Sequence, residues 1–538
     1  MQRLLVPITL LLSFVVILPI CIIAFSVFSF DVELWRHLLA TVFKDYVTNS
    51  LILAIGVGFG TIVIGTYLAY CMVNFDFFGK AVLSWLILLP LAMPAYIIAY
   101  TYTGLLDFAG PLQSFLRESF DWQRGDYWFW DIRSLSGAIV MMILVLYPYV
   151  YILARTAFSE QSYSYQKVSQ LSGLNAWQHI RKVSLPLARP AIVTGAALAM
   201  MEALADYGTV AYFGIGTFTT GIFRTWFGMG NIQGAAQLAT VLCMFVLVLL
   251  VLEKRSRLDA AKFHRGKYID APKPRLTGAR SFSMFGLCIL PALFGFIIPF
   301  TQLLVWSIEY SSVGDWPEFF SLVTNSFTLA FIGALVIVGI ALLVSYAKRM
   351  FADKSLKVSE QMLSLGYAVP GIVIAVGVLI LTGWLDRTIN ALTLSWWEYR
   401  PGLIFSGTVF TLLFAYTIRF ASVALQNTET GFARLPTKLD QASLSLDGRL
   451  WRLFSQVHFP LLAPSIISAM LLVFVDILKE LPATLVLRPF NFNTLAVKTF
   501  ELASDERLLD AALPAVSIVL VGILPVMLLT RQLNKKSV

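Results

Sequence analysis

The sequence predicts an all-α integral membrane protein with about 12 transmembrane helices, arranged as two parallel repeats of six. The first observation is composition: 58% of the 538 residues are hydrophobic and 13% are charged, whereas soluble domains average about 45–50% and about 25%. The second is that the apolar residues gather in runs of roughly 20–25, which as helices cross a hydrocarbon core about 30 Å thick. The third is an internal repeat.

The second half of the chain repeats the first at a nearly constant spacing. At 274 residues, three residues of the first half recur in the second: Trp177, Pro186 and Pro190 as Trp451, Pro460 and Pro464. Earlier in each half the spacing is 276, which aligns segment 47–50 with 323–326. Solenoid units repeat about every 20–50 residues. A repeat spacing of 274 residues therefore indicates a duplicated domain. We expect the following division: a first repeat at 1–252, a basic linker at 253–281 and a second repeat at 282–538.

Each repeat supplies six apolar runs. In the first repeat the expected spans are 4–28, 48–73, 82–104, 136–157, 188–212 and 236–252. In the second they are 283–308, 324–347, 360–382, 403–425, 463–486 and 511–530. The first run is longer than the core of a signal peptide and has no clear cleavage site, so we expect a true span. Pro94 and Pro370 lie at matching places in the third spans and are expected to kink them.

Lysine and arginine in the loops predict the orientation, because basic residues concentrate on the cytoplasmic side of a membrane. The linker, the loop 347–358 and the C-terminal end are rich in Lys and Arg, and even span numbers put all three on one side. Segments 118–132 and 309–319, on the opposite side, are more acidic and aromatic. Both termini are therefore expected in the cytoplasm. The net charge of +9 reflects this bias and does not indicate nucleic-acid binding.

Cysteine, histidine and nucleotide-binding patterns exclude several functions. The four cysteines all fall in predicted spans without CxxC spacing, and the four histidines are scattered. Neither pattern indicates a metal site built from Cys or His. The sequence contains no GxxxxGK[ST] phosphate-binding loop, so any ATP would be hydrolysed by a partner subunit.

Two similar segments, 166–190 and 440–464, precede the fifth span of each repeat. Each suggests a short amphipathic helix, a turn, a second short helix with a tryptophan, and an entry to the membrane marked by a proline (Trp177 and Pro186; Trp451 and Pro460). Apolar side chains repeated in a cytoplasmic loop predict a docking site for a partner. A helix lying on the bilayer surface would give the same pattern.

The first segment, in which Gly173 precedes Pro186 by thirteen residues, resembles the EAA loop of ABC-importer permeases. The match is incomplete, since the usual Glu-Ala-Ala aligns with residues 167–169 and 441–443, and Asp447 replaces the glycine in the second copy. Segments 201–214 and 479–484 closely resemble the fused ferric-iron permeases of that superfamily. The resemblance covers nearly the whole chain.

This resemblance implies the fold of a type I ABC-importer permease and a role as the translocation pore for ferric iron in a bacterial inner membrane. It implies that two copies of a cytoplasmic ATPase dock on the loops and that a periplasmic or lipid-anchored binding protein delivers the iron. The chain itself would have no catalytic residue and no cofactor. The residues implied in coupling to the ATPase are Gly173, Trp177, Pro186, Asp447, Trp451 and Pro460.

Four carboxylates in the fifth spans are candidate cation contacts: Glu202, Asp206, Asp476 and Glu480. The first two lie four residues apart on one helix face, and the last two are their repeat equivalents. A carboxylate at mid-membrane costs at least about 2.5–3.5 kcal/mol, and hard cations prefer oxygen ligands. Tyr207 and Tyr212 are weaker candidates.

Other interpretations of these residues stay open. Lys479 could pair with one of the acids, and Asp206 or Glu480 could bond the backbone at a helix break. The same architecture could carry thiamine, a polyamine or an oxyanion. An ion-coupled secondary transporter could use the carboxylates as proton relays, although the paired loops argue against it.

Overall fold

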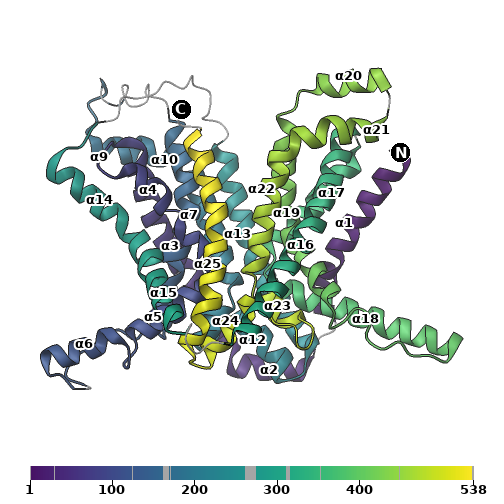
Figure 1. Cartoon of the computed structure of the whole chain (residues 1–538), viewed down its shortest axis with the longest axis horizontal. Coiled ribbons are helices and arrows are strands. Elements are labelled where there is room, and N and C mark those ends of the chain that lie inside the picture. The colour runs from purple at the N-terminus through teal and green to yellow at the C-terminus, as the bar shows by residue number, and fades with distance from the viewer. Residues whose placement is uncertain are drawn as a thin grey trace. The chain divides into compact units, whose positions relative to one another are not determined.

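The computed structural model describes residues 2–28, 31–123, 125–161, 169, 171–260, 274–310, 315–351, 353–447 and 449–535. Across those residues the fold is all-α, apart from one isolated bridge between Asp76 and Arg275. Eleven helices are long and apolar enough to cross a membrane, and a bent pair, Lys80–Ala92 with Ala95–Phe120, makes up to twelve (Figure 1). The predicted all-α class of about twelve spans is confirmed.

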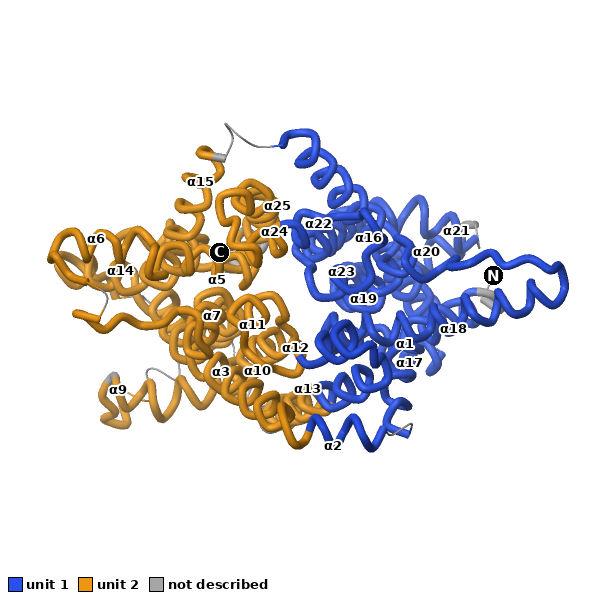
Figure 2. Tube along the Cα trace, turned by 90° about the horizontal axis from the view of Figure 1, so that it is seen from below, with its two compact units in different colours: residues 1–38, 221–243, 315–498 blue, residues 39–220, 244–314, 499–538 orange. Residues whose placement is uncertain are grey.

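The helices form two compact units, each assembled from both halves of the sequence (Figure 2). The ranges of unit 1 are 1–38, 221–243 and 315–498, and those of unit 2 are 39–220, 244–314 and 499–538. Helix α1 (Gln2–Phe25) thus belongs to the unit that contains most of the second half, and α14 (Gly278–Ala292) and α15 (Ile298–Tyr310) belong to the other. The units describe packing and the predicted repeats describe duplication, so the repeat boundaries stay a prediction. Much of the predicted linker, 261–273, lies outside the described residues.

Unit 2 is centred on α3, which packs along α7 and α10. Its helices are α3 (Phe43–Asn74), α4 (Lys80–Leu86), α5 (Ala95–Leu106), α6 (Pro111–Phe120), α7 (Leu135–Ser159), α9 (Ala176–His179), α10 (Leu185–Ala205), α11 (Gly208–Tyr212), α14, α15 and α25 (Leu508–Lys535). Glycines let the three central helices approach closely. A Cβ on Gly65 would lie 2.7 Å from the Cβ of Val150, and a Cβ on Gly195 would lie 2.6 Å from the Cα of Val150. Small residues at such contacts let helix backbones approach within a membrane.

Unit 1 is centred on α16, α19 and α22, which pack on one another as α3, α7 and α10 do. Besides α1, its helices are α16 (Trp316–Met350), α17 (Lys354–Leu365), α18 (Gly371–Trp397), α19 (Val409–Ala433), α20 (Thr437–Asp447), α21 (Leu450–Arg452), α22 (Phe459–Leu478) and α23 (Pro482–Leu487). Four helices have residues in both units: α2 (Val32–Thr41), α12 (Phe218–Phe223), α13 (Ile232–Ala260) and α24 (Leu495–Ser504). Helix α1 packs on α17 and α18, where a Cβ on Gly377 would lie 2.5 Å from the carbonyl oxygen of Pro19.

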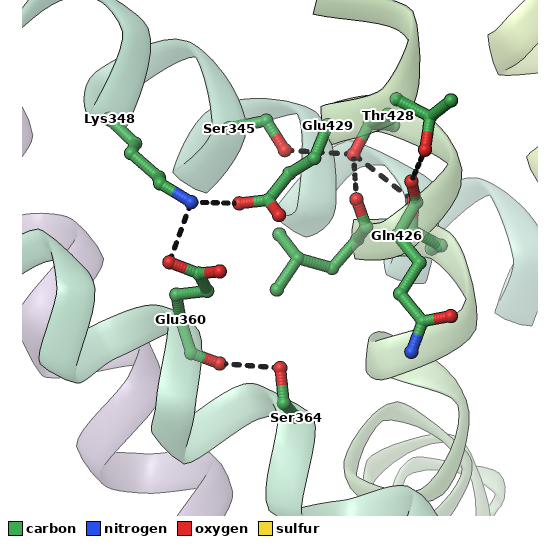
Figure 3. A network of polar contacts seen from close by, with 10 residues as sticks. Ser345, Lys348, Glu360, Ser364, Gln426, Thr428 and Glu429 are labelled. Carbon is green, nitrogen blue, oxygen red and sulfur yellow. Dashed lines mark hydrogen bonds and ion pairs between the residues drawn. The ribbon is translucent and has the colours of Figure 1, made fainter. Parts of the chain in front are cut away.

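An ion network ties α17 to α16 and α19 (Figure 3). The Lys348 Nζ atom lies 2.6 Å from a carboxylate oxygen of Glu360 and 2.7 Å from one of Glu429. At the start of α17, the backbone N–H and the hydroxyl of Ser355 donate to Asp353 and hold the pKa of that carboxyl below its ordinary value. Charge as well as apolar contact therefore holds α17, the helix on which α1 packs.

The third span of each half is broken at a proline, where the sequence predicted only a kink. Helix α5 begins directly after Pro94 and α18 directly after Pro370. The preceding residues, Met93 and Val369, are extended with ψ of 117° and 127°, as the ring of a following proline requires. The expected continuity of spans 82–104 and 360–382 is therefore wrong, because proline removes an N–H donor and clashes with the preceding turn.

The fifth span of each half ends earlier than predicted. Helix α10 ends at Ala205 and α22 at Leu478, whereas the sequence suggested helices to 212 and 486. A short helix, α11 or α23, resumes after the break. The predicted acids Asp206 and Glu480 lie at these two breaks, so the functional candidates and the departures from helix coincide.

Candidate functional site

Asp206 caps the helix that follows the first break. Its Oδ1 accepts hydrogen bonds from the backbone N–H groups of Thr209 at 2.9 Å and Val210 at 3.4 Å, and its Oδ2 accepts from the Thr209 hydroxyl at 3.2 Å. Its own carbonyl accepts from the hydroxyl of Thr219 at 2.8 Å. A side-chain oxygen that receives the first N–H groups of a helix is the usual N-cap arrangement. The carboxylate therefore satisfies the start of α11 inside an apolar bundle.

Glu480 performs the same task at the second break. Its carboxylate accepts from the N–H groups of Ala483 and Thr484, each at 3.0 Å, and from the Thr484 hydroxyl at 2.7 Å. The residue is buried. The same hydroxyl lies 2.6 Å from the Tyr416 hydroxyl of α19, which links the break to the centre of unit 1.

Glu480 also has a cationic partner within the membrane helices. The Arg419 guanidinium, from α19, lies 3.3 Å from a Glu480 carboxylate oxygen. Gly371, the first residue of α18, makes room for the pair: a Cβ there would lie 1.9 Å from the Arg419 Nη1 and 2.7 Å from the Glu480 Oε1. At the spacing of 274, the residue that matches Arg419 in the first half is Val145. The two breaks therefore differ in charge although both have a capping acid.

The other two acids lie one turn earlier on the fifth helices. Asp476 pairs with Lys479, whose Nζ is 2.8 Å from the carboxylate. Glu202 is partly buried on α10. Glu202 and Asp206 belong to unit 2 and the other pair belongs to unit 1. Among the residues that the structure describes, no three Asp, Glu, His or Cys side chains form a group that could hold a metal ion, so cation contact stays a prediction.

A buried polar cluster fixes the segment before α22. Asp440, on α20, accepts from Arg349 Nε at 2.7 Å through one oxygen and lies 2.8 Å from His458 Nε2 through the other. Arg349 also donates to the carbonyls of Phe432 at 3.2 Å and Leu435 at 2.9 Å, at the end of α19. The segment is thus joined to the ends of α16 and α19.

Trp451, on α21, stands away from this cluster with 69% of its surface exposed. The backbone just before it is tied down, because the Tyr346 hydroxyl of α16 donates to the Leu450 carbonyl at 2.6 Å. Pro460 lies in the first turn of α22, directly after a π-helical segment at Leu453–His458. The last residue of α20 is Asp447. The Trp451 side chain is therefore exposed, while the backbone beside it is held by a hydrogen bond.

Histidine also organises the corresponding segment of the first half, through hydroxyls instead of charges. His179 Nδ1 lies 2.8 Å from the Ser169 hydroxyl and its Nε2 lies 3.1 Å from the Ser184 hydroxyl. Trp177, on α9, is 67% exposed, almost the same as its repeat equivalent. Lys167 and Val168, which align with the first two residues of the EAA motif, lie outside the described part of the chain.

The turn and the helix starts of this segment have well-defined local geometry. Gly173 has φ of +71°, a left-handed conformation that glycine adopts without strain. A reciprocal pair of bonds between Asn175 and Gln178 caps α9, with the Gln178 N–H donating to Asn175 Oδ1 at 2.8 Å and the Asn175 N–H to Gln178 Oε1 at 3.0 Å. Pro186 lies in the first turn of α10.

Sequence reasoning missed Arg419, Gly371 and the Arg349–Asp440–His458 cluster. Arg419 could have been found, because a lone arginine within a predicted span is costly in a membrane and indicates a partner. The space that Gly371 leaves is a tertiary feature with no local signal.

Comparisons with known proteins agree with this architecture. Residues 61–253 match the family described as "Binding-protein-dependent transport system inner membrane component". The chain is 26% identical over 494 residues to the Fe(3+)-transport system permease protein FbpB 2 of Haemophilus influenzae, covering 90% of both chains. It is 24% identical to the ferric transport system permease protein FbpB of Actinobacillus pleuropneumoniae, covering 88% of this chain and 69% of that one.

A shorter relative matches part of the chain. The putative molybdenum transport system permease protein YvgM of Bacillus subtilis is 26% identical over 176 residues, which cover 32% of this chain and 74% of that protein. The match of about a third of the chain to a separate permease, and of 90% of it to a ferric permease, agrees with a fused pair of permease domains. Residues 61–253 therefore match the binding-protein-dependent transport system inner membrane component family, and the chain is similar over most of its length to ferric transport permeases of the ABC-importer type.

Proposed function

We propose that this chain forms the translocation pore of an ATP-driven importer of ferric iron. The observation that carries the proposal is the similarity to the Fe(3+)-transport permease of Haemophilus influenzae, which extends over 90% of both chains. Because the similarity spans both repeats, it accounts for the duplication and for the twelve candidate spans together. The chain would have no cofactor of its own.

In this proposal, the segments that carry Trp177 and Trp451 face the cytoplasm and each receives one copy of a separate ATPase. Both tryptophans are about two thirds exposed on short helices, and partly buried hydrogen bonds hold the neighbouring backbone in place. An exposed aromatic side chain can contact a partner, and a backbone that hydrogen bonds hold in place can transmit the partner's movement to the membrane helices. Gly173, Pro186, Asp447 and Pro460 shape the turns and helix entries of these segments. Both chain termini would then be cytoplasmic, and a binding protein would deliver iron at the opposite face.

The four acids would contribute in two ways. Glu202 and Asp476 would contact iron transiently, because carboxylate oxygen suits a hard cation. Asp206 and Glu480, whose oxygens already accept hydrogen bonds from α11 and α23, would hold the helix breaks beside the path. Asp206 would also add negative charge to the path, whereas Arg419 balances the charge of Glu480. Weak and successive contacts suit transport, since a tight site would prevent release.

A molybdenum oxyanion is the second candidate cargo, because the molybdenum permease YvgM is similar to one third of this chain. Glu202 and Asp206 would repel an anion, and the similarity to the ferric permeases covers more of the chain. These two observations favour iron.

The proposal can be tested in proteoliposomes that hold the permease with its ATPase, with the binding protein supplied outside. We expect uptake of radiolabelled ferric iron that needs ATP and persists when the proton gradient is collapsed. Uptake of molybdate in place of iron would overturn the cargo. Uptake that needs the proton gradient and not ATP would overturn the importer class.

A further inference from the structure

The second part of α18 leaves the bundle and forms an arm (Figure 1). Residues 371–378 of this helix are buried, whereas exposure rises from Trp384 onward. The chain then turns back through 398–408. We name residues 384–408 the α18 arm.

The α18 arm is fixed in shape by polar groups on one side of its helix. The buried Asp386 carboxylate accepts from the N–H groups of Ile404, Phe405 and Ser406 at 3.1, 2.9 and 2.8 Å. Asn390 exchanges two bonds with the backbone of Gly402, at 2.6 and 2.9 Å. The returning segment is therefore pinned along the Asp386 side.

The opposite side of the arm is apolar and exposed. Trp384, Leu392 and Trp396 are 55%, 53% and 75% exposed. At about 100° per residue they fall within roughly one third of the helix circumference, away from Asp386 and Asn390. The arm thus presents an apolar face with nothing from its own hairpin covering it.

The first half has an arm at the same place, after its broken third span. We name residues 108–123 and 125–133 the α6 arm. The rest of the hairpin again bonds to its helix: Gln113 donates to the Leu106 carbonyl at 2.8 Å and accepts from the Tyr127 hydroxyl at 2.7 Å. Leu112, Phe115 and Phe120 form the exposed apolar side.

The composition of the α18 arm is typical of the edge of the hydrocarbon. Its helical part carries Trp384, Trp396 and Trp397, all exposed. Tryptophan is enriched at the membrane–water interface. A helix with one apolar and one polar side lies in the plane of the interface.

Two further observations favour lipid over a protein partner. Both arms present exposed apolar side chains, but neither the residues nor their spacing match: Trp384, Leu392 and Trp396 against Leu112, Phe115 and Phe120. A fluid apolar medium requires only an apolar face, whereas a protein pocket selects particular side chains. Arg387 on α18 and Arg400 in the returning segment are exposed and suit lipid phosphates.

We propose that the α6 arm and the α18 arm are interfacial anchors, each with its apolar face seated between the headgroups and acyl chains of the bilayer. In each unit the arm lies at the end of the helices opposite to the segment that carries Trp177 or Trp451 (Figure 1). The anchors would hold the ends of the broken third spans at constant depth while other helices move. This assignment does not depend on the cargo.

The test uses the full permease with its ATPase in nanodiscs of phosphatidylethanolamine and phosphatidylglycerol. A single cysteine replaces Leu392 or Phe115 on a background in which the four native cysteines are alanine, and carries an environment-sensitive fluorophore. The matched controls on the polar sides are Thr393→Cys and Glu118→Cys. We expect lipids with a nitroxide near the headgroup to quench the Leu392 and Phe115 labels several-fold more than the controls, and aqueous iodide to quench them less.

Labels at 392 and 115 that iodide quenches and lipid nitroxides do not would overturn the proposal. Shielding that appears only when the binding protein is added would assign the faces to that protein, and cross-linking between permeases would assign them to a second copy. Hydroxyl-radical footprinting of the unsubstituted chain gives a second readout that needs no cysteine. Oxidation of Phe115, which is 63% exposed in the structure, should in nanodiscs be several-fold slower than that of Phe490, which is 93% exposed; equal rates would contradict the anchor.

Discussion

The Arg419 guanidinium and the Glu480 carboxylate lie 3.3 Å apart where α19 meets the break between α22 and α23. At the corresponding break in the first half, Asp206 caps α11, and the residue matching Arg419 is Val145. One repeat thus neutralises its capping acid with a neighbouring helix, and the other lacks that arginine. The two breaks therefore share a capping acid but differ in whether a neighbouring arginine balances its charge.

Removal of the arginine should destabilise unit 1. Arg419→Met leaves the buried Glu480 charge without its partner, and breaking a buried pair from one side costs about 3–5 kcal/mol. The free energy of unfolding, measured by SDS titration in mixed micelles, should fall accordingly.

The double variant Arg419→Met with Glu480→Gln is the control for that prediction. The glutamine keeps an oxygen to accept from α23 and has no charge, so much of the lost stability should return. A single variant as stable as the unchanged chain would contradict a structural role for the pair.

Cap and charge can be separated at Asp206. Asp206→Ala removes the acceptor for the first N–H groups of α11 and should cost about 0.5–2 kcal/mol of unfolding free energy. Asp206→Asn keeps an acceptor oxygen and should retain most of that stability. Iron uptake by the asparagine variant then reports the charge alone: reduced uptake at normal stability supports a role in the path, and normal uptake assigns the residue to the cap.

Gly371 should tolerate no side chain. A Cβ there would lie 1.9 Å from the Arg419 Nη1, so Gly371→Ala must displace the ion pair, and overpacking of this kind costs about 1–3 kcal/mol. Gly339→Ala, in the middle of α16 with nothing within 4 Å of the added Cβ, is the matched control and should gain about 0.5–1 kcal/mol. Equal effects of the two substitutions would show that the close contact at Gly371 is absent in the membrane.

The exposed tryptophans should be required for ATPase binding. Trp177→Asp together with Trp451→Asp places charges on the two tips without touching the buried hydrogen bonds below them, so a co-purifying ATPase should be lost while the permease keeps its thermal stability. Phe490→Asp, another exposed aromatic but outside these segments, should leave the complex intact. Retention of the ATPase by the double variant would contradict docking at these sites.

Much of the fold follows from local sequence. Apolar runs of sufficient length predicted the twelve candidate spans, and prolines at matching positions marked where Pro94 and Pro370 disturb the third span. The full break in the third span depends on the extended backbone of Met93 and Val369, and hydropathy carries no information on backbone conformation. The early ends of α10 and α22 coincide with hydrogen bonds from the following helix to Asp206 and Glu480, and hydropathy carries no information on such bonds either.

Tertiary pairings were out of reach of the sequence. Helices α1 and α15 pack within units made largely of the other half of the sequence. Helical periodicity predicts which side of a helix is buried but not which helix packs against that side. Arg419 lies 61 residues before Glu480, so the carboxylate could be recognised as costly while its neutralising group could not be named. The capping role of the two acids, by contrast, was among the expected alternatives because its partners lie only three and four residues away.

The most direct test of an iron pathway along the fifth helices is uptake of radiolabelled ferric iron by cells that express this chain with its ATPase and binding protein. The comparison is with Glu202→Gln combined with Asp476→Asn, the two acids that lie before the breaks and cap neither α11 nor α23. The account predicts uptake by the unchanged chain and its loss in the double variant, with equal membrane abundance and an intact complex with the ATPase. Equal uptake by the double variant would contradict the acidic path, and no uptake by the unchanged chain would contradict iron as the cargo.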